Sequence, residues 1–446
     1  MYRFPVGLYT DVRLEHVFST LIVYENFQLT QNKEKREQGA FIRVFDGARW
    51  YYSATTDLQR IQEEIDSLAQ MATPTEGIED HAVVKQFEVH KSEEMRYRDM
   101  AVSNIEKAKK KALLDAYLPV LQEREDLSML TRAYYLDKYT EKRIISSKGT
   151  DITFDTQTCA VALRYSFQVD GKPFRGSQDI LKDSFDDLAG HQQQVRNQLE
   201  EDYQYRLHAV PVEPGTYTCV LAPEVTGVFA HESFGHKSEA DFMVGDETMM
   251  REWAIGTRVG SEGLNILDTG LPCGSGYVPY DDEGSQAKEN YIIKNGVLVG
   301  RLHSAFTAAA LGEATTGNAR AMNFEFEPIV RMTTTYIGAG TQTKEALIEA
   351  VEDGLYISDI NHGSGMSTFT IAPRKAYRIR NGKIAEPVEV SVITGNVMET
   401  LNEIDGFSNI VELSSFALGG CGKMEQYPLP VGFGGPYIRV KNMQVQ

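Results

Sequence analysis

The stretch "FAHESFGHKSEADF", Phe229–Phe242, gathers two histidines and three carboxylates in a short space. His231, Glu232 and His236 nearly spell the zinc-binding helix motif H-E-x-x-H, but the second histidine comes one residue late. A regular helix turns about 100° per residue, so these histidines would lie about 140° apart. A local π-type turn, in which residues i and i+5 are neighbours, would bring them together, and Gly235 favours one by weakening the regular helix. The alternative is two unrelated histidines in the core or on the surface.

A catalytic zinc site uses three protein ligands and leaves the fourth position to water, so the two histidines need a third partner. Glu239 and Asp241 are candidates within the same stretch. Cys421 is a distant candidate in "LGGCGKMEQ", where glycines let the backbone bring a thiolate close to an ion. The alternative for Cys421 is a buried, inert cysteine, which more often occupies an apolar strand than a glycine-rich turn.

Taken together, these motifs resemble the TldD branch of the TldD/PmbA family of zinc metalloproteases, some members of which carry the label "modulator of DNA gyrase". The resemblance covers most of the chain and is densest from Gly215 to Arg439. It rests on "GTYTCVL", "HESFGHKSEADF", "YDDEG", "IIKNGVLVGRL", "TTGNARA", "RMTTTYI", "NGKIAEPV" and "GGCGK". Two positions depart from the family pattern: Lys237 stands where Gly is frequent, and Thr334 where Asn is common. Both lie outside the expected ligand set and bear on substrate contacts.

The resemblance implies a role for each motif residue by its position. His231, His236 and Cys421 match the zinc ligands, and Glu232 matches the catalytic carboxylate. In that scheme Glu232 activates a zinc-bound water and later protonates the leaving amine. The related PmbA or TldE branch is similar in fold but lacks the metal motif, so this chain resembles the catalytic branch.

We therefore expect a metallopeptidase, a hydrolase with a Zn²⁺ cofactor that cuts peptide bonds in peptides or unfolded protein segments. The resemblance implies dimers with an enclosed active site, formed either with a second copy or with a PmbA/TldE-like subunit. Extended substrates are expected to pair with an open sheet edge. The alternative is a non-catalytic structural or partner subunit of such a complex. A third hypothesis, a regulator of DNA topology, requires an indirect effect through proteolysis of another protein.

The charge and composition of the chain narrow the possible partners. The 446 residues carry a net charge of −18, which disfavours direct contact with nucleic acid. Hydrophobic residues make up 42%, a normal balance for a globular chain with a sizeable core. The four cysteines form no C-x-x-C pair, and the sequence has no apolar run long enough to cross a bilayer and no signal-peptide core. These features predict a cytoplasmic protein without a membrane partner.

The first half of the chain mixes strand and helix signals. Asp46-Gly47 predicts a hairpin within Phe41–Ser53, and Lys148-Gly149 and Asp170-Gly171 predict turns joining three further strands. Helical periodicity predicts a long helical region over Ser92–Arg132. Its one basic cluster, "EKAKKKALL", is interpreted as a solvated helix face. Another amphipathic helix follows before residue 208.

The second half is rich in strands and glycines. Asn295-Gly296 and Asn381-Gly382 predict hairpins. Only two later helices are expected, "TKEALIEAVEDG" ended by Gly354 and a segment at Val397–Ile404. The predicted fold class is α+β: a mixed α/β N-terminal domain, residues 1–205, followed by a β-rich, largely antiparallel C-terminal domain, residues 206–446, that carries the metal-site helix.

Some chemically capable residues receive a plainer interpretation. The acidic turn in "YDDEG", Tyr280–Gly284, is predicted to be structural rather than a second cation site. Tyr277 and Tyr280 are both candidates for stabilising an oxyanion, and the sequence selects neither. His303 is expected to be an ordinary histidine, whereas His362 lies in a segment that could line the cleft.

Overall fold

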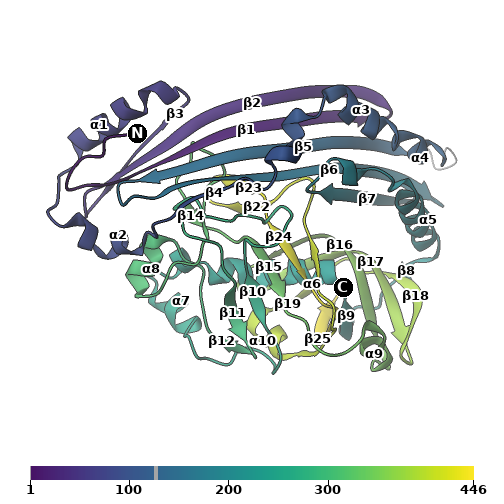
Figure 1. Ribbon diagram of the computed structural model, residues 1–446. Helices are drawn as coiled ribbons and strands as arrows, with labels where there is room; N and C mark the ends of the chain where they lie inside the picture. The colour runs from purple at the N-terminus through teal and green to yellow at the C-terminus, as the bar shows by residue number, and fades with distance from the viewer. Residues whose placement is uncertain (1, 125–128) are drawn as a thin grey trace.

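The computed structural model describes residues 2–124 and 129–446. A long, curved sheet from the first half of the chain arches over a β-rich C-terminal region (Figure 1). The strand order in this sheet is β3-β2-β1-β5-β6-β4, with β7 also paired to β6. All its pairings are antiparallel except that of β4 with β6. The strands are β1 (Tyr9–Glu25), β2 (Gln28–Phe45), β3 (Trp50–Thr55), β4 (Lys91–Glu94), β5 (Leu130–Ser146), β6 (Asp151–Val169) and β7 (Lys172–Lys182).

The three predicted turns of this sheet are confirmed. Asp46-Gly47 lies between β2 and β3, Lys148-Gly149 between β5 and β6, and Asp170-Gly171 between β6 and β7. Gly47 and Gly149 adopt positive φ angles of 96° and 105°, which explains why glycine follows the turn residue at these points.

The long helix predicted over Ser92–Arg132 is wrong in most of its length. Its described part contains the end of β4, short 3₁₀ turns, α3 (Lys107–Asp115), α4 (Leu118–Gln122) and the start of β5, while residues 125–128 lie outside the described residues. Tertiary partners outweigh the helical periodicity here, because β4 pairs with β6 and Asp155 accepts hydrogen bonds from the Tyr97 amide.

The lysine-rich helix α3 also differs from its interpretation as a solvated face. Lys110 is fully buried, with its Nζ 2.7 Å from an Asp137 carboxylate oxygen and 2.9 Å from the Thr20 hydroxyl. Its ammonium also lies 4.5 Å from the centre of the Phe18 ring. Lys110 therefore anchors α3 to the sheet through a paired charge.

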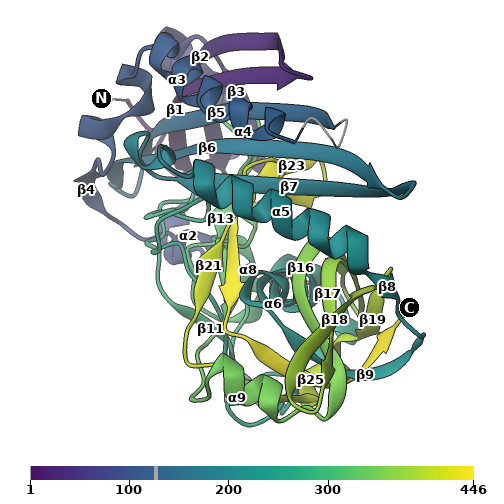
Figure 2. The same cartoon turned by 90° about the vertical axis from the view of Figure 1, so that its right-hand side faces the viewer.

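Other helices cover the sheet or join it to the C-terminal region. Helix α5 (Gln192–His208) runs between β7 of the arched sheet and strands β16–β18 of the C-terminal region (Figure 2). Its Val195 and Leu199 pack into the sheet core, and its Tyr205 hydroxyl donates to the Val388 carbonyl in the C-terminal region. The helices not yet bounded are α1 (Ile61–Met71), α2 (Ala82–Gln86), α6 (Pro223–Ala230), α7 (Glu247–Glu252), α8 (Ala305–Leu311), α9 (Lys344–Glu349) and α10 (Val397–Asn402).

The C-terminal region is built on two main sheets that pack around one hydrophobic core. In the larger sheet the order is β16-β9-β25-β19-β17-β18-β8, and a β16–β17 pairing closes part of it into a ring. Its strands are β8 (Val210–Pro211), β9 (Gly215–Leu221), β16 (Asp353–Gly365), β17 (Thr368–Arg380), β18 (Lys383–Glu389), β19 (Ile393–Asn396), β20 (Ile404–Phe407) and β25 (Ile438–Val445).

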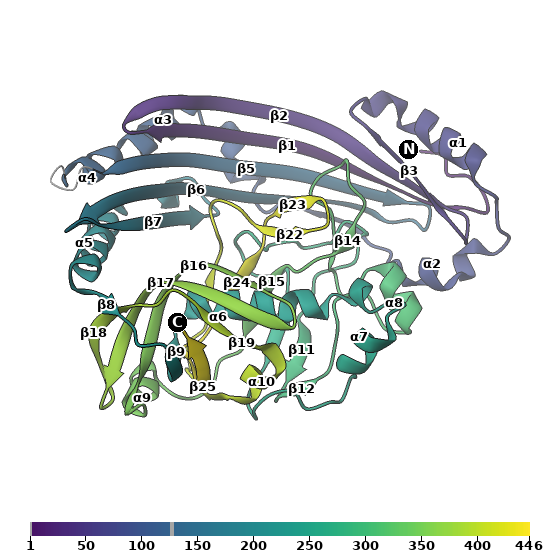
Figure 3. The ribbon, with the colours of Figure 1, turned by 180° about the vertical axis from the view of Figure 1, so that it is seen from behind.

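The smaller sheet has the order β12-β11-β10-β15-β24-β21, and two short hairpins stand apart from it. Its strands are β10 (Ile266–Asp268), β11 (Asn290–Lys294), β12 (Val297–Leu298), β15 (Thr334–Ile337), β21 (Glu412–Ser414) and β24 (Gly432–Gly435). The hairpins are β13 (Ala319–Arg320) with β14 (Ile329–Val330), and β22 (Cys421–Lys423) with β23 (Gln426–Leu429). The second hairpin lies directly beneath the arched sheet (Figure 3).

Most sequence predictions for this region hold. The predicted α+β class, with a largely antiparallel β-rich C-terminal part, is confirmed, as are the hairpins at Asn295-Gly296 and Asn381-Gly382. Helix α9 ends earlier than predicted, since Gly354 already belongs to β16. The described chain also holds two helices, α7 and α8, that the sequence did not predict. The division at residues 1–205 and 206–446 stays a prediction.

The acidic turn of "YDDEG" joins the arched sheet to the C-terminal region. Asp282 accepts a 2.6 Å hydrogen bond from Lys142, and Glu283 accepts one of 2.9 Å from Arg43. Asp281 instead accepts backbone N–H groups of its own and neighbouring loops. These carboxylates are thus bound by protein donors, in agreement with the structural interpretation.

None of the described helices combines the length and the apolar character needed to cross a membrane.

Candidate metal centre and substrate cleft

Helix α6 carries the histidine motif into the space between the two C-terminal sheets. It begins with Pro223, whose fixed φ suits the first turn, and it packs closely on β24. A Cβ atom on Gly227 would lie 2.4 Å from the Gly434 amide nitrogen, so glycine is required for this contact. The motif is therefore held on a buried helix rather than on a surface loop.

The predicted π-type turn is confirmed. The helix widens into a π turn over His231–Gly235 and tightens into a 3₁₀ turn over His236–Ser238. As a result the two imidazole rings lie 5.1 Å apart between their centres, at 82° to one another. The π turn therefore allows two histidines that are five residues apart to share one ligand site.

Cys421 joins the two histidines from the other end of the C-terminal region. Its Sγ lies 3.5 Å from His236 Nε2, and the three potential ligand atoms all lie within 4.8 Å of one another. Gly420, which directly precedes strand β22, has a φ of 154°. A Cβ atom on this residue would lie 2.5 Å from the Leu429 carbonyl oxygen. The Arg331 guanidinium donates to the Cys421 carbonyl at 2.8 Å and fixes the hairpin.

The electrostatics of the cluster favour a thiolate. Burial raises the pKa of the Cys421 thiol, but hydrogen bonds and charge from His231 and His236 outweigh it and lower that pKa to about 5. Burial conversely lowers the pKa of His236, while Cys421 and Glu239 raise it to about 10. Without a metal the pair is thus a thiolate beside an imidazolium.

Glu239 and Asp241, the nearby candidates for a third ligand, are not brought into the cluster. The Glu239 carboxylate lies 3.4 Å from His236 Nδ1 and 3.0 Å from Lys423 Nζ, and Asp241 accepts from the same lysine at 2.7 Å. A carboxylate on Nδ1 holds the tautomer whose Nε2 faces Cys421, as outer carboxylates of zinc sites do. Sequence spacing could not distinguish a direct ligand from such an orienting residue.

The donor set fits a tetrahedral zinc ion. One thiolate and two imidazoles are ligands that zinc prefers, and bond lengths of about 2.0–2.3 Å require about 3–4 Å between ligand atoms. The 3.5 Å separation of Cys421 and His236 meets this requirement. The His231 Nδ1 atom is also buried without a hydrogen-bond partner among the described residues.

Glu232 lies beside this cluster and lines the same cavity. Burial raises the pKa of its carboxyl, and the charges of His231 and His236 oppose that rise. Strand β16 passes very close to it, since a Cβ on Gly365 would lie 2.9 Å from the Glu232 carbonyl oxygen. Glycine on β16 therefore leaves room for the π turn and keeps Glu232 at the cavity wall.

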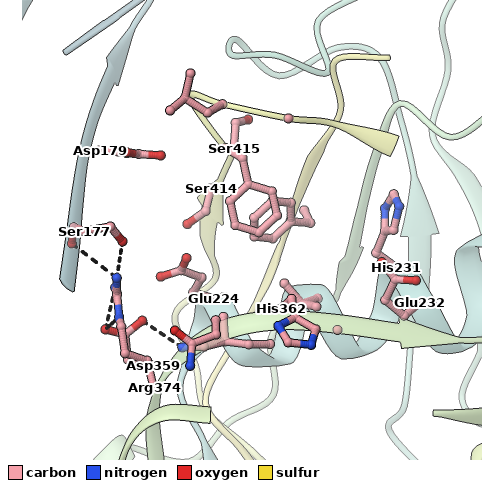
Figure 4. Close-up of a pocket in the computed structure, with 18 of the residues that line it drawn as sticks. Ser177, Asp179, Glu224, His231, Glu232, Asp359, His362, Arg374, Ser414 and Ser415 are labelled. Atoms are coloured by element: carbon pink, nitrogen blue, oxygen red, sulfur yellow. Dashed lines mark hydrogen bonds and ion pairs between the residues drawn. The ribbon is translucent and has the colours of Figure 1, made fainter. Parts of the chain in front are cut away.

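The cavity has a volume of about 960 Å³ and extends well beyond the histidines. Figure 4 shows His231 and Glu232 at one end and Glu224, Asp359 and Arg374 toward the other. Sequence reasoning missed this second end. Glu224 precedes His231 by seven residues, about two helical turns, so the spacing places both on one helix face and was a usable signal.

The remaining candidates divide between the cavity and other places. His362 lines the cavity from β16. Tyr280 lies elsewhere, where it donates to Glu94 at 2.8 Å, and Tyr277 packs edge-on against Tyr97. His303 is 2.8 Å from a Glu313 carboxylate, which is an ordinary buried pairing.

The π turn leads to a testable prediction at Gly235. A Cβ on this residue would lie 1.9 Å from the sulfur of the fully buried Met332. Gly235→Ala is expected to lower the free energy of unfolding by about 1–3 kcal/mol through overpacking, and to weaken zinc binding. Urea unfolding and a chelator competition measure the two effects. In Met332→Ala protein the added methyl should cost less; an equal cost in both backgrounds would contradict this explanation.

Comparison with known proteins supplies evidence independent of this geometry. Residues 214–446 match the model of the PmbA/TldA metallopeptidase C-terminal domain, and residues 10–73 match that of PmbA/TldA metallopeptidase domain 1. A Synechocystis metalloprotease is 32% identical over 98% of this chain and 94% of its own. A Saccharolobus solfataricus protein described as a zinc metalloprotease TldD homologue is 35% identical over 70% of each chain.

The fold is also similar to that of a solved structure. TldE from Thermococcus kodakarensis superposes with a TM-score of 0.74, covering 98% of this chain and 96% of that one, at 15% sequence identity. At this level of identity the comparison bears on the fold alone.

Proposed function

Because the chain belongs to the PmbA/TldA metallopeptidase family, we propose that it is a zinc-dependent peptidase acting on peptides or unfolded protein segments. The observation that carries this proposal is the convergence of His231, His236 and Cys421 beside Glu232 at the wall of a large cavity. The first three would hold the zinc ion, and Glu232 would be the catalytic residue.

When bound, zinc polarises the scissile carbonyl and makes a water molecule acidic near neutral pH. Glu232 takes the proton of the attacking water and then returns it to the leaving amine. Its raised pKa suits both steps, because a carboxyl closer to neutrality accepts and releases a proton more readily. Glu239 keeps the His236 ring in the orientation that presents Nε2.

Strand β16 offers the cavity a free edge to which an extended peptide could add. Strand β9 pairs with β16 only over Gly354–Ile357, and the pairings of the described strands leave the same edge of β16 free beyond that point. Residues 358–363 of β16 line the cavity. A substrate chain that adds to this edge would gain backbone hydrogen bonds without demanding a particular sequence.

We further propose that the active form is a dimer in the cytoplasm, made either of two copies or of this chain and a TldE-like subunit. The similarity of fold to TldE and the TldD-homologue relative support such a pairing. Light scattering of the chain alone and mixed with a TldE-like subunit distinguishes the two forms.

Removal and restoration of the metal test the proposed activity. A chelator is expected to abolish hydrolysis of an unstructured peptide, and equimolar zinc is expected to restore it, because the three donors lack catalytic power without the ion. Elemental analysis should find one zinc per chain. One bound zinc together with no hydrolysis of any peptide or unfolded protein offered would favour the non-catalytic subunit instead.

A further inference from the structure

The end of the cavity remote from the histidines is lined by one carboxylate more than it has lysine and arginine side chains. Asp179 is bound by Arg164, Asp359 by Arg374, and Glu201 by Lys375. Glu224 is the fourth carboxylate on this lining, and no hydrogen bond or ion pair joins its side chain to another residue of the described chain. The lining thus holds four acidic groups and three basic ones.

The position of Glu224 relates it to the reacting end of the cavity. It lies on the same helix as Glu232, eight residues earlier, which corresponds to about 12 Å of helix rise. An extended peptide advances about 3.3 Å per residue, so this distance equals three or four substrate residues. The floor of the cavity between the two glutamates is formed by α6 and β16 (Figure 4).

We propose that Glu224 determines specificity by binding a cationic group of the substrate three or four residues from the scissile bond. The cation is either a lysine or arginine side chain or the free amino terminus of a short peptide, since both present the same charge. This inference rests on the proposed peptidase function. It goes further by naming the substrate class. A partly buried carboxylate that has no ion-pair partner is stabilised most by a ligand that carries a positive charge.

The local charges agree with this role. Burial raises the pKa of Glu224 to about 7, with Asp359 and Asp179 adding to the rise and Arg374 and Lys375 opposing it. The carboxyl is therefore charged above about pH 7 and neutral below it. A preference for cationic substrates is therefore expected to grow between pH 6 and 8. A preference set by protonation of the substrate amine would instead weaken as the pH rises.

The alternative role for Glu224 is purely structural, because an acidic residue in the first turn stabilises a helix through the helix dipole. Such a role would affect all peptides equally. The experiment therefore compares peptides rather than absolute rates. A neutral peptide receives one lysine at each position in turn, with norleucine at the same position as its uncharged match, and each peptide is made with a free and an acetylated amino terminus.

The wild-type chain is expected to favour one lysine position, or the free amino terminus, roughly tenfold in kcat/KM. Glu224→Gln should bring that ratio close to one, and Glu224→Lys should reverse it, so that the norleucine peptide is preferred over the lysine peptide. The control Glu345→Gln removes an exposed carboxylate from α9 and should keep the ratio. Circular dichroism and zinc content establish that each variant is folded.

Binding measurements separate this inference from the proposed catalysis. In Glu232→Gln protein, fluorescence anisotropy gives the dissociation constant of each peptide pair without turnover. The same roughly tenfold preference should appear there and disappear with Glu224→Gln, even if hydrolysis is never detected. Equal affinity for all lysine and norleucine pairs, or a preference that survives Glu224→Gln, would overturn the proposal.

Discussion

Glu232→Gln is expected to lower kcat for peptide hydrolysis by about 10²–10⁴-fold, the usual contribution of a general acid–base. Glutamine keeps the shape of the side chain but cannot accept the proton of the attacking water. The residue lies beside the three donors without belonging to them, so zinc content should remain at one per chain. KM should change little, because the carboxylate acts on the water and not on the substrate backbone.

Single-turnover hydrolysis and elemental analysis on the same preparation provide the measurement. Glu345→Gln on α9 is the matched control, since it removes one carboxylate at an exposed position far along the chain. Glu232→Asp should recover only part of the rate. It restores a carboxylate, but the shorter side chain leaves that carboxylate farther from the attacking water. Full activity in Glu232→Gln would remove this residue from the mechanism, and loss of zinc would show that it supports the metal instead.

The second large effect is expected at Cys421. Cys421→Ser should weaken zinc binding by at least about 100-fold and abolish hydrolysis, because serine keeps the size of the side chain but does not supply a thiolate. Two imidazoles alone leave the site one donor short. The matched control is Cys273→Ser, which alters a cysteine at the surface and should bind zinc normally.

Proton release gives an independent readout of the same cluster. The pKa of Cys421 is lowered to about 5 and that of His236 raised to about 10, so the metal-free pair holds one proton between these values, on the imidazole. Zinc must displace it, and affinity should rise about tenfold per pH unit between about pH 5 and pH 10. Calorimetry in buffers of different ionisation enthalpy should find about one proton released by the wild type over this range. No release would show that the pair is already deprotonated.

The sequence was most informative where a residue type is demanded by local backbone geometry. The five-residue spacing of His231 and His236 admits a shared site only through a wider helical turn, and the structure has that turn. The Asn-Gly pairs marked their hairpins for the same reason, since both residues tolerate positive φ. Such local rules predicted the hairpins of both halves and the geometry of the histidine pair.

The sequence does not predict features that depend on contacts between residues far apart in the chain. The sequence predicts a solvated face for the helix that carries Lys110, whereas the structure buries this lysine against Asp137, on a strand 27 residues later in the sequence. The helix expected from Ser92 gave way to a strand that pairs with β6. Glu239 was a candidate ligand, and its contact with Lys423 could not be read from spacing. In each case the interaction that decides the structure joins two segments that become neighbours only when the chain folds.

The order of the three donors along the chain has a consequence for biosynthesis. The histidines lie at 231 and 236, but the sulfur belongs to residue 421, which follows the second histidine by 185 residues. During translation the proposed zinc ion can acquire its full set of donors only after residue 421 has left the ribosome. A nascent chain that has not yet reached Cys421 therefore has an incomplete centre, and the proposed hydrolysis is deferred until the cavity around that centre has formed.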